Sequence, residues 1–199
     1  MTRRELITKT SMALGYTLSA PVLMGVLKGC APEHTKNYKP VFFTDEEAII
    51  VGDIAETILP RTDTPGAKDV GVPAFIDRFI NDIFSNEEKA KIKTEIAEFN
   101  QSSVGRHFKT FVECNFNTQS QWVKKLHNDV VKKIEASSEG WWADENPDRP
   151  FIIKIKELTL LGFFTSEAGA TQVLQYNQAP GPFQGCVPLE DVGKAWATS

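Results

Sequence analysis

The stretch "TDEEAIIVGDIAETILP" at residues 44–60 decides the fold class of this chain. Thr44 is followed three residues later by a glutamate, and this pair is the capping box that starts an α-helix. Ile50, Ile54 and Ile58 then recur at four-residue steps, which is the spacing of one helix face. The stretch ends in a proline, which cannot continue a helix. It therefore predicts an amphipathic helix that begins after Thr44 and ends before the proline.

Similar helix signals follow in the first half of the chain. Residues 61–73 are rich in turn-forming residues and predict an ordered loop. A second helix is expected after Pro73, and a capping box at residues 85–88 predicts the start of a third. Residues 104–116 are expected to form a shorter helix. Helices therefore dominate this half.

The second half continues the pattern. Thr118 is expected to cap a helix whose apolar stripe runs from Trp122 to Ile134 at four-residue steps. The run "FIIKIKELTLLGFF" at residues 151–164 predicts a helix, because its length and the preceding proline outweigh the strand preference of Ile and Phe. From Ser166 onward we expect a short helical piece and then loop. The fold class is all-α, an irregular bundle of about five to seven helices with a long C-terminal loop segment.

The charge distribution excludes nucleic acid as a partner. Residues 1–29 carry four of the 22 basic side chains and one of the 26 acidic ones. The remainder therefore has 18 basic and 25 acidic side chains and a net charge of −7. Nucleic-acid binding favours clustered Lys and Arg instead.

The N-terminal residues resemble an export signal. Arg3 and Arg4 lie in "TRRELI", which resembles the twin-arginine signal that carries folded proteins across a membrane. "LKGC" resembles a lipobox, in which Cys30 would be lipidated, although Lys28 replaces the small uncharged residue usual there. An uncleaved anchor helix and a Sec-type signal are the alternatives.

These features predict three parts in the chain. Residues 1–29 are expected to be a twin-arginine signal peptide with a lipobox, residues 30–40 a flexible tether, and residues 41–199 a helical domain. We therefore expect a periplasmic lipoprotein that is exported by the twin-arginine route and anchored in the membrane.

No cofactor or metal motif is found in the sequence, so no cofactor is expected in this chain. The glycine patterns that bind dinucleotides and phosphates are absent, as are the grouped cysteines of haem and iron–sulfur sites. No histidine has a second ligand at helical spacing. Cys114 and Cys186 either form a disulfide or are two buried thiols, and both interpretations stay open.

An aromatic and acidic loop is a further candidate site. Trp141 and Trp142 precede Asp144, Glu145 and Asp148, and aromatics beside carboxylates are able to bind or hydrolyse a sugar. A solvated loop held by its tryptophans is favoured over that hypothesis. If the loop has a role, a protein interface comes first, since Trp is enriched at binding hot spots.

The export signal and the missing cofactor site together suggest a partner. Twin-arginine export serves proteins that fold before crossing, often around a cofactor. One resolution is that the cofactor belongs to a partner without its own signal, which crosses the membrane bound to this chain.

Two stretches of the chain carry distinctive motifs. Residues 158–188 contain "GFFTSEAG", then a Tyr, a Pro-Gly and "GCVP", and residues 57–67 read "TILPRTDTPGA". Both stretches resemble the subunit 3 family of gluconate 2-dehydrogenase, whereas residues 85–148 match only in helical character. The resemblance covers nearly the whole chain, the leader included.

The resemblance implies a non-catalytic subunit of a membrane-associated dehydrogenase. The catalytic partner would be an FAD-dependent flavoprotein of the glucose-methanol-choline type that oxidises a sugar, sugar acid or polyol and reduces an acceptor such as a cytochrome c. The small subunit would supply the export signal, support maturation and anchor the complex. We expect residues 162–188 to dock the partner, with Phe163 and Phe164 as anchors unless they pack in the core. The further candidate docking residues are Tyr176, Pro180, Gly181, Phe183 and Trp196.

Two rival functions stay open. One is an independent envelope lipoprotein that binds or acts on carbohydrate, and turnover by the isolated chain would support it. The other is an electron-transfer subunit, which an absorbing cofactor in the purified chain would support.

Overall fold

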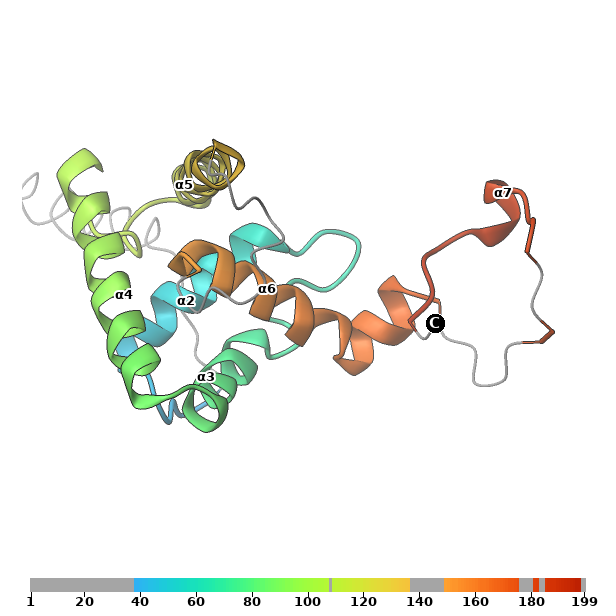
Figure 1. Ribbon diagram of the computed structural model, residues 1–199, viewed down its shortest axis with the longest axis horizontal. Helices are drawn as coiled ribbons and strands as arrows, with labels where there is room; N and C mark the ends of the chain where they lie inside the picture. The colour runs from blue at the N-terminus through green and yellow to red at the C-terminus, as the bar shows by residue number, and fades with distance from the viewer. Residues whose placement is uncertain (1–37, 108, 137–148, 176–180, 183–184, 198–199) are drawn as a thin grey trace, which may run out of the picture. The chain divides into compact units, whose positions relative to one another are not determined.

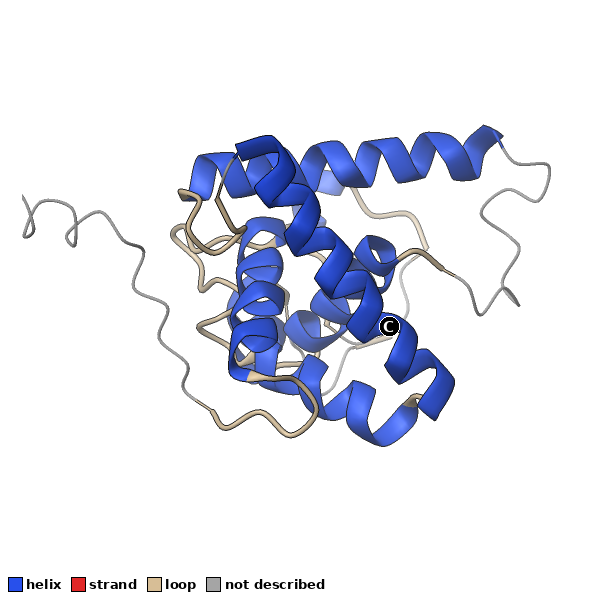
Figure 2. Cartoon of the chain, turned by 90° about the vertical axis from the view of Figure 1, so that its left-hand side faces the viewer, coloured by secondary structure: helices blue, strands red, loops and turns tan. Residues whose placement is uncertain are grey.

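The computed structural model describes residues 38–107, 109–136, 149–175, 181–182 and 185–197. These residues form six α-helices and one short π-helix and contain no β-strand. Figures 1 and 2 show that helices and loops make up the described part of the chain. The prediction of an all-α fold with about five to seven helices is confirmed. The elements are α2 (Asp45–Ile58), α3 (Val72–Ile83), α4 (Asn86–His107), α5 (Phe116–Ala136), α6 (Phe151–Phe164), η1 (Gly169–Val173) and α7 (Leu189–Val192).

Several sequence predictions fall on residues outside the described ranges. They are the export signal at Arg3 and Arg4, the lipidation of Cys30, most of the tether, and the loop with Trp141, Trp142, Asp144, Glu145 and Asp148. Within the described part, no helix combines the length and the apolar character needed to cross a membrane.

Helix α6 lies at the centre of the bundle and contacts α2, α3, α4 and α5 (Figure 1). Its first five residues, Phe151 to Ile155, are all buried. A helix that is buried over most of its length needs no broad polar face, and this explains why its sequence is apolar with little helical periodicity. The helix prediction for residues 151–164 is confirmed.

Helix α2 begins at the capping box expected from the sequence. The Thr44 amide donates to Glu47 Oε2 at 2.7 Å, and the Glu47 amide donates to Thr44 Oγ1 at 3.3 Å. Ile50 and Ile54 are buried, and Ile58 packs half-buried against the core. The predicted face is therefore the face that the helix buries.

Two helix boundaries differ from the prediction. No separate helix covers residues 104–116, because α4 continues to His107 and residues 109–115 form a turn. This turn is held by the Phe111 amide, which donates to Asn100 Oδ1 of α4 at 3.2 Å. The predicted cap at Thr118 is also wrong, since the Thr118 amide donates to the Asn115 side chain at 2.9 Å and α5 starts at Phe116. Asn115 lies three residues before Thr118, and its side chain accepts a hydrogen bond from a helix amide that would otherwise have no partner.

The C-terminal segment contains more helix than expected. The predicted short helical piece is η1, and α7 is an additional turn of helix in a region expected to be loop. Pro188 precedes α7 at a position where proline's fixed φ favours a helix start.

Asp77 fixes the start of the domain to α3. Its buried carboxylate accepts hydrogen bonds from the amides of Val41 at 2.6 Å, Phe42 at 3.1 Å and Phe43 at 2.8 Å. Burial and then the Asp77 charge raise the pKa of the nearby Tyr38 hydroxyl, so Tyr38 stays neutral. The residues that follow the predicted tether are thus bound to the bundle through one side chain.

Candidate functional site

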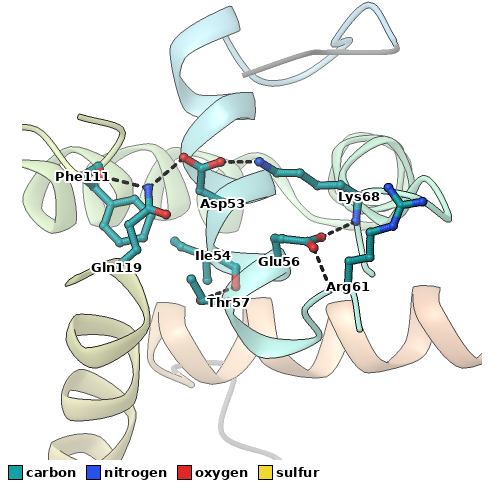
Figure 3. A network of polar contacts seen from close by, with 8 residues as sticks. All are labelled: Asp53, Ile54, Glu56, Thr57, Arg61, Lys68, Phe111 and Gln119. Atoms are coloured by element: carbon teal, nitrogen blue, oxygen red, sulfur yellow. Dashed lines mark hydrogen bonds and ion pairs between the residues drawn. The ribbon is translucent and has the colours of Figure 1, made fainter. Parts of the chain in front are cut away.

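The loop after α2 carries the first of the two family-like motifs and is shaped by Glu56. The Glu56 carboxylate accepts from the Arg61 amide and the Lys68 amide, both at 2.9 Å (Figure 3). A Cβ atom on Gly66 would lie 2.4 Å from Glu56 Oε1, so no larger residue fits there without a shift. The motif residues therefore build the loop itself.

A buried polar network holds this loop against two helices. Asp53 of α2, only 3% exposed, accepts from Lys68 Nζ at 2.5 Å and from Gln119 Nε2 of α5 at 3.0 Å (Figure 3). Gln119 Nε2 also donates to the Phe111 carbonyl at 3.0 Å. Sequence reasoning missed these residues, although an aspartate between Ile50 and Ile54 on a buried face was a signal for such a network.

The second motif, residues 162–169, shapes the end of α6. A Cβ atom on Gly162 would lie 2.6 Å from Phe75 Cδ1 of α3, so the two helices are in close contact at this glycine. Ser166 Oγ donates to the Phe163 carbonyl at 2.6 Å and accepts from the Gly169 amide at 3.0 Å. A Cβ atom on Gly169 would overlap the Phe163 carbonyl oxygen at 1.9 Å. Much of the motif is thus explained by packing between α6, α3 and η1.

The two phenylalanines of this motif have different environments. Phe163 is 3% exposed and belongs to the hydrophobic core, so the core alternative applies to it. Phe164 is 37% exposed, and Leu161, one turn earlier, is 45% exposed. Burying exposed apolar side chains of this size is favourable in an interface. Leu161 and Phe164 together are called the α6 outer face below.

The C-terminal segment is closed on itself by Gln175. The Gln175 amide donates to the Ala195 carbonyl at 2.8 Å, the Ala197 amide donates back to the Gln175 carbonyl at 2.8 Å, and the Gln175 side chain donates to the carbonyls of Val192 and Lys194. Trp196 lies in this bridge and is 48% exposed. The segment therefore presents an aromatic side chain on a defined backbone.

The remaining predicted docking residues divide between the described and undescribed parts of the chain. Gly181 is exposed, whereas Tyr176, Pro180 and Phe183 lie outside the described residues. Cys114 is buried and Cys186 is exposed, and the structure holds both as free thiols. The interpretation as two buried thiols fits Cys114 only.

A pocket of about 210 Å³ lies between α2, α5 and α6. Its polar residues include His127 and Lys156, whose side chains approach each other to 2.9 Å between Nε2 and Nζ. No group of three or more potential metal ligands occurs among the described residues. His127 is half-buried at the edge of this pocket.

Comparison with known proteins bears on the resemblance stated from the two motifs. Neither the curated proteins nor the solved structures gave a significant match. The model of the family described as gluconate 2-dehydrogenase subunit 3 matches residues 45–181. This region includes the loop after α2 and the whole of the second motif through η1. Because the match extends over more than half of the chain, the protein belongs to the gluconate 2-dehydrogenase subunit 3 family.

Proposed function

We propose that this chain is the non-catalytic small subunit of a periplasmic, membrane-associated sugar or sugar-acid dehydrogenase. It binds an FAD-dependent catalytic subunit of the glucose-methanol-choline type, which passes electrons to an acceptor such as a cytochrome c. Membership of a subunit family supports a catalytic partner. The twin-arginine and lipobox resemblances at Arg3, Arg4 and Cys30 support export and anchoring of the complex.

The observation that carries this proposal is the exposed apolar surface next to the family motif. Phe164 and Leu161 belong to a helix of which nine residues are buried, yet both of these apolar side chains are exposed. Trp196 is exposed on a backbone that Gln175 already holds, so docking there orders few additional residues. Exposed aromatics on an ordered backbone are the usual anchors of a protein interface.

The docking proposal is tested by co-expressing the full chain with the flavoprotein subunit of its dehydrogenase. Phe164→Asp should lower recovery of the flavoprotein on the tagged small chain by roughly tenfold or more, because a charge replaces an apolar anchor. Ile83→Asp is the matched control, since Ile83 is 66% exposed at the end of α3 and lies outside the motif. Equal recovery with both variants would exclude the α6 outer face as the docking surface.

The export proposal has a separate test. Changing Arg3 and Arg4 to lysine should keep both subunits in the cytoplasm, because the twin-arginine route requires the arginine pair. Cys30→Ala should allow export and release the complex from the membrane fraction. A flavin-loaded partner that reaches the periplasm when the small chain is deleted would contradict the export role.

A further inference from the structure

The pocket between α2, α5 and α6 has an apolar interior. Ile58 of α2, Val123 of α5 and Ile152 of α6 line it, and Val123 and Ile152 are themselves buried. These residues come from three helices that pack against one another, so the pocket has a rigid lining. Its volume of about 210 Å³ offers room for roughly seven water-sized groups. A short aliphatic chain would fit this interior.

The polar residues of the pocket are basic or neutral. Lys124 of α5 and Lys156 of α6 both line it, and none of the described residues that line it is acidic. The neighbouring Glu157 pairs with Arg149 and not with Lys156. In a domain with an overall negative charge, the pocket therefore concentrates positive charge beside an apolar interior.

His127 holds one of these lysines in place. Lys156 Nζ lies 2.9 Å from His127 Nε2, and since an ammonium has only donors, the lysine is the donor in this contact. An ammonium carries three N–H donors, and this contact uses one of them. Lys156 thus has donors left for an anionic ligand, and its position at the pocket is restrained before any ligand binds.

We infer that this pocket binds a small organic carboxylate with an apolar body. The carboxylate contacts Lys156 and Lys124, and the aliphatic chain lies against Ile58, Val123 and Ile152. A cationic ligand is disfavoured by the two lysines, and a neutral ligand gains only the apolar contacts. This site is independent of docking to a catalytic subunit and is assigned on its own lining residues.

Methyl NMR of the full chain reports directly on this pocket, because three of its lining residues carry methyl groups. Hexanoate, 1-hexanol and hexylammonium are titrated separately. Hexanoate should shift the methyl signals of Ile58, Val123 and Ile152 in a saturable manner. The dissociation constant for 1-hexanol should be roughly tenfold higher than for hexanoate, which reflects the loss of the charged hydrogen bonds.

Substitution of the lysine separates charge recognition from a general apolar pocket. Lys156→Met keeps the aliphatic stem and should weaken hexanoate roughly tenfold while leaving 1-hexanol binding unchanged. An unchanged dissociation constant for 1-hexanol also shows that the pocket is intact in the variant. Lys132→Met, an exposed lysine of α5 that does not line the pocket, should leave both ligands unaffected.

Three results would overturn the inference. The first is hexanoate that leaves all three pocket methyls unshifted. The second is a dissociation constant for hexanoate that equals the one for 1-hexanol or for hexylammonium. The third is Lys156→Met binding hexanoate as tightly as the unchanged chain does.

Discussion

Gly162 of α6 packs directly against the ring of Phe75 in α3, where a Cβ atom would lie 2.6 Å from Phe75 Cδ1. The absence of a side chain on Gly162 leaves room for the Phe75 ring between α3 and α6, directly before the motif that follows. Gly162→Ala should therefore lower the free energy of unfolding by about 2 kcal/mol, because the Phe75 ring must move. Urea denaturation followed by circular dichroism measures this change.

Gly105→Ala is the control for that prediction. Gly105 lies in α4, and nothing surrounds the place that its Cβ would occupy. Alanine has a higher helix propensity than glycine, so the free energy of unfolding of this variant should rise by about 0.5–1 kcal/mol. If both glycine variants changed stability in the same direction, the close contact at Phe75 would be excluded as the cause.

The three amides that converge on Asp77 give a second prediction. Asp77→Asn keeps the shape of the side chain but turns an N–H group toward backbone donors. We therefore expect the free energy of unfolding to fall by about 3 kcal/mol. Asp82→Asn, an exposed change on the same helix, should alter stability by less than about 0.5 kcal/mol. Hydrogen exchange of the Val41 and Phe43 amides should accelerate only in the first variant.

Glu47 gives a pH-dependence prediction. Burial acts to raise the pKa of Glu47, but the Lys93 ammonium and the Thr44 amide outweigh burial and lower it below the usual 4.5. A pKa lowered by folding adds stability above the unfolded value, and this stability is lost as the pH falls below about 4.5. Urea midpoints between pH 7 and pH 3 should therefore fall less steeply for Glu47→Gln than for the unchanged chain. Glu46→Gln, which changes an exposed neighbour, should leave the slope unaltered.

Lys154 gives a stabilising prediction. Lys154 is 8% exposed, and its ammonium group has no hydrogen-bond partner in the described part of the chain. Lys154→Met keeps the aliphatic stem and removes the desolvated charge, so the free energy of unfolding should rise by about 1–2 kcal/mol. Lys133→Met at an exposed site should have no such effect. A melting temperature that falls on Lys154→Met would show that the ammonium is satisfied in solution.

The predictions that succeeded from sequence rest on local signals. Helix α2 has its cap, its charge pattern and its apolar spacing within 17 residues, and all three agree. The start of α5 could not be predicted in the same way, because Asn115 and Thr118 are both good caps. The choice between them depends on the turn before α5, which Phe111 and Asn100 fix from 11 residues apart.

The candidate site depends even more on contacts between distant residues. Phe163 and Phe164 are adjacent and chemically identical, and only the packing of α6 on α3 decides which one is buried. The pocket around Lys156 combines residues from α2, α5 and α6, so no short motif could reveal it. The family motif selected the segment for the docking prediction, but the exposed fraction of each side chain came from the structure.

The Asp77 contact also determines how the domain responds to a mechanical load. A force applied to the chain from its N-terminal side acts first on the three hydrogen bonds that backbone amides donate to the Asp77 carboxylate. Through them it is transmitted to α3 before it reaches α2. These bonds share the force, whereas the capping box at Thr44 is shielded behind them. A domain restrained in this way should stay folded under traction until the Asp77 cluster opens.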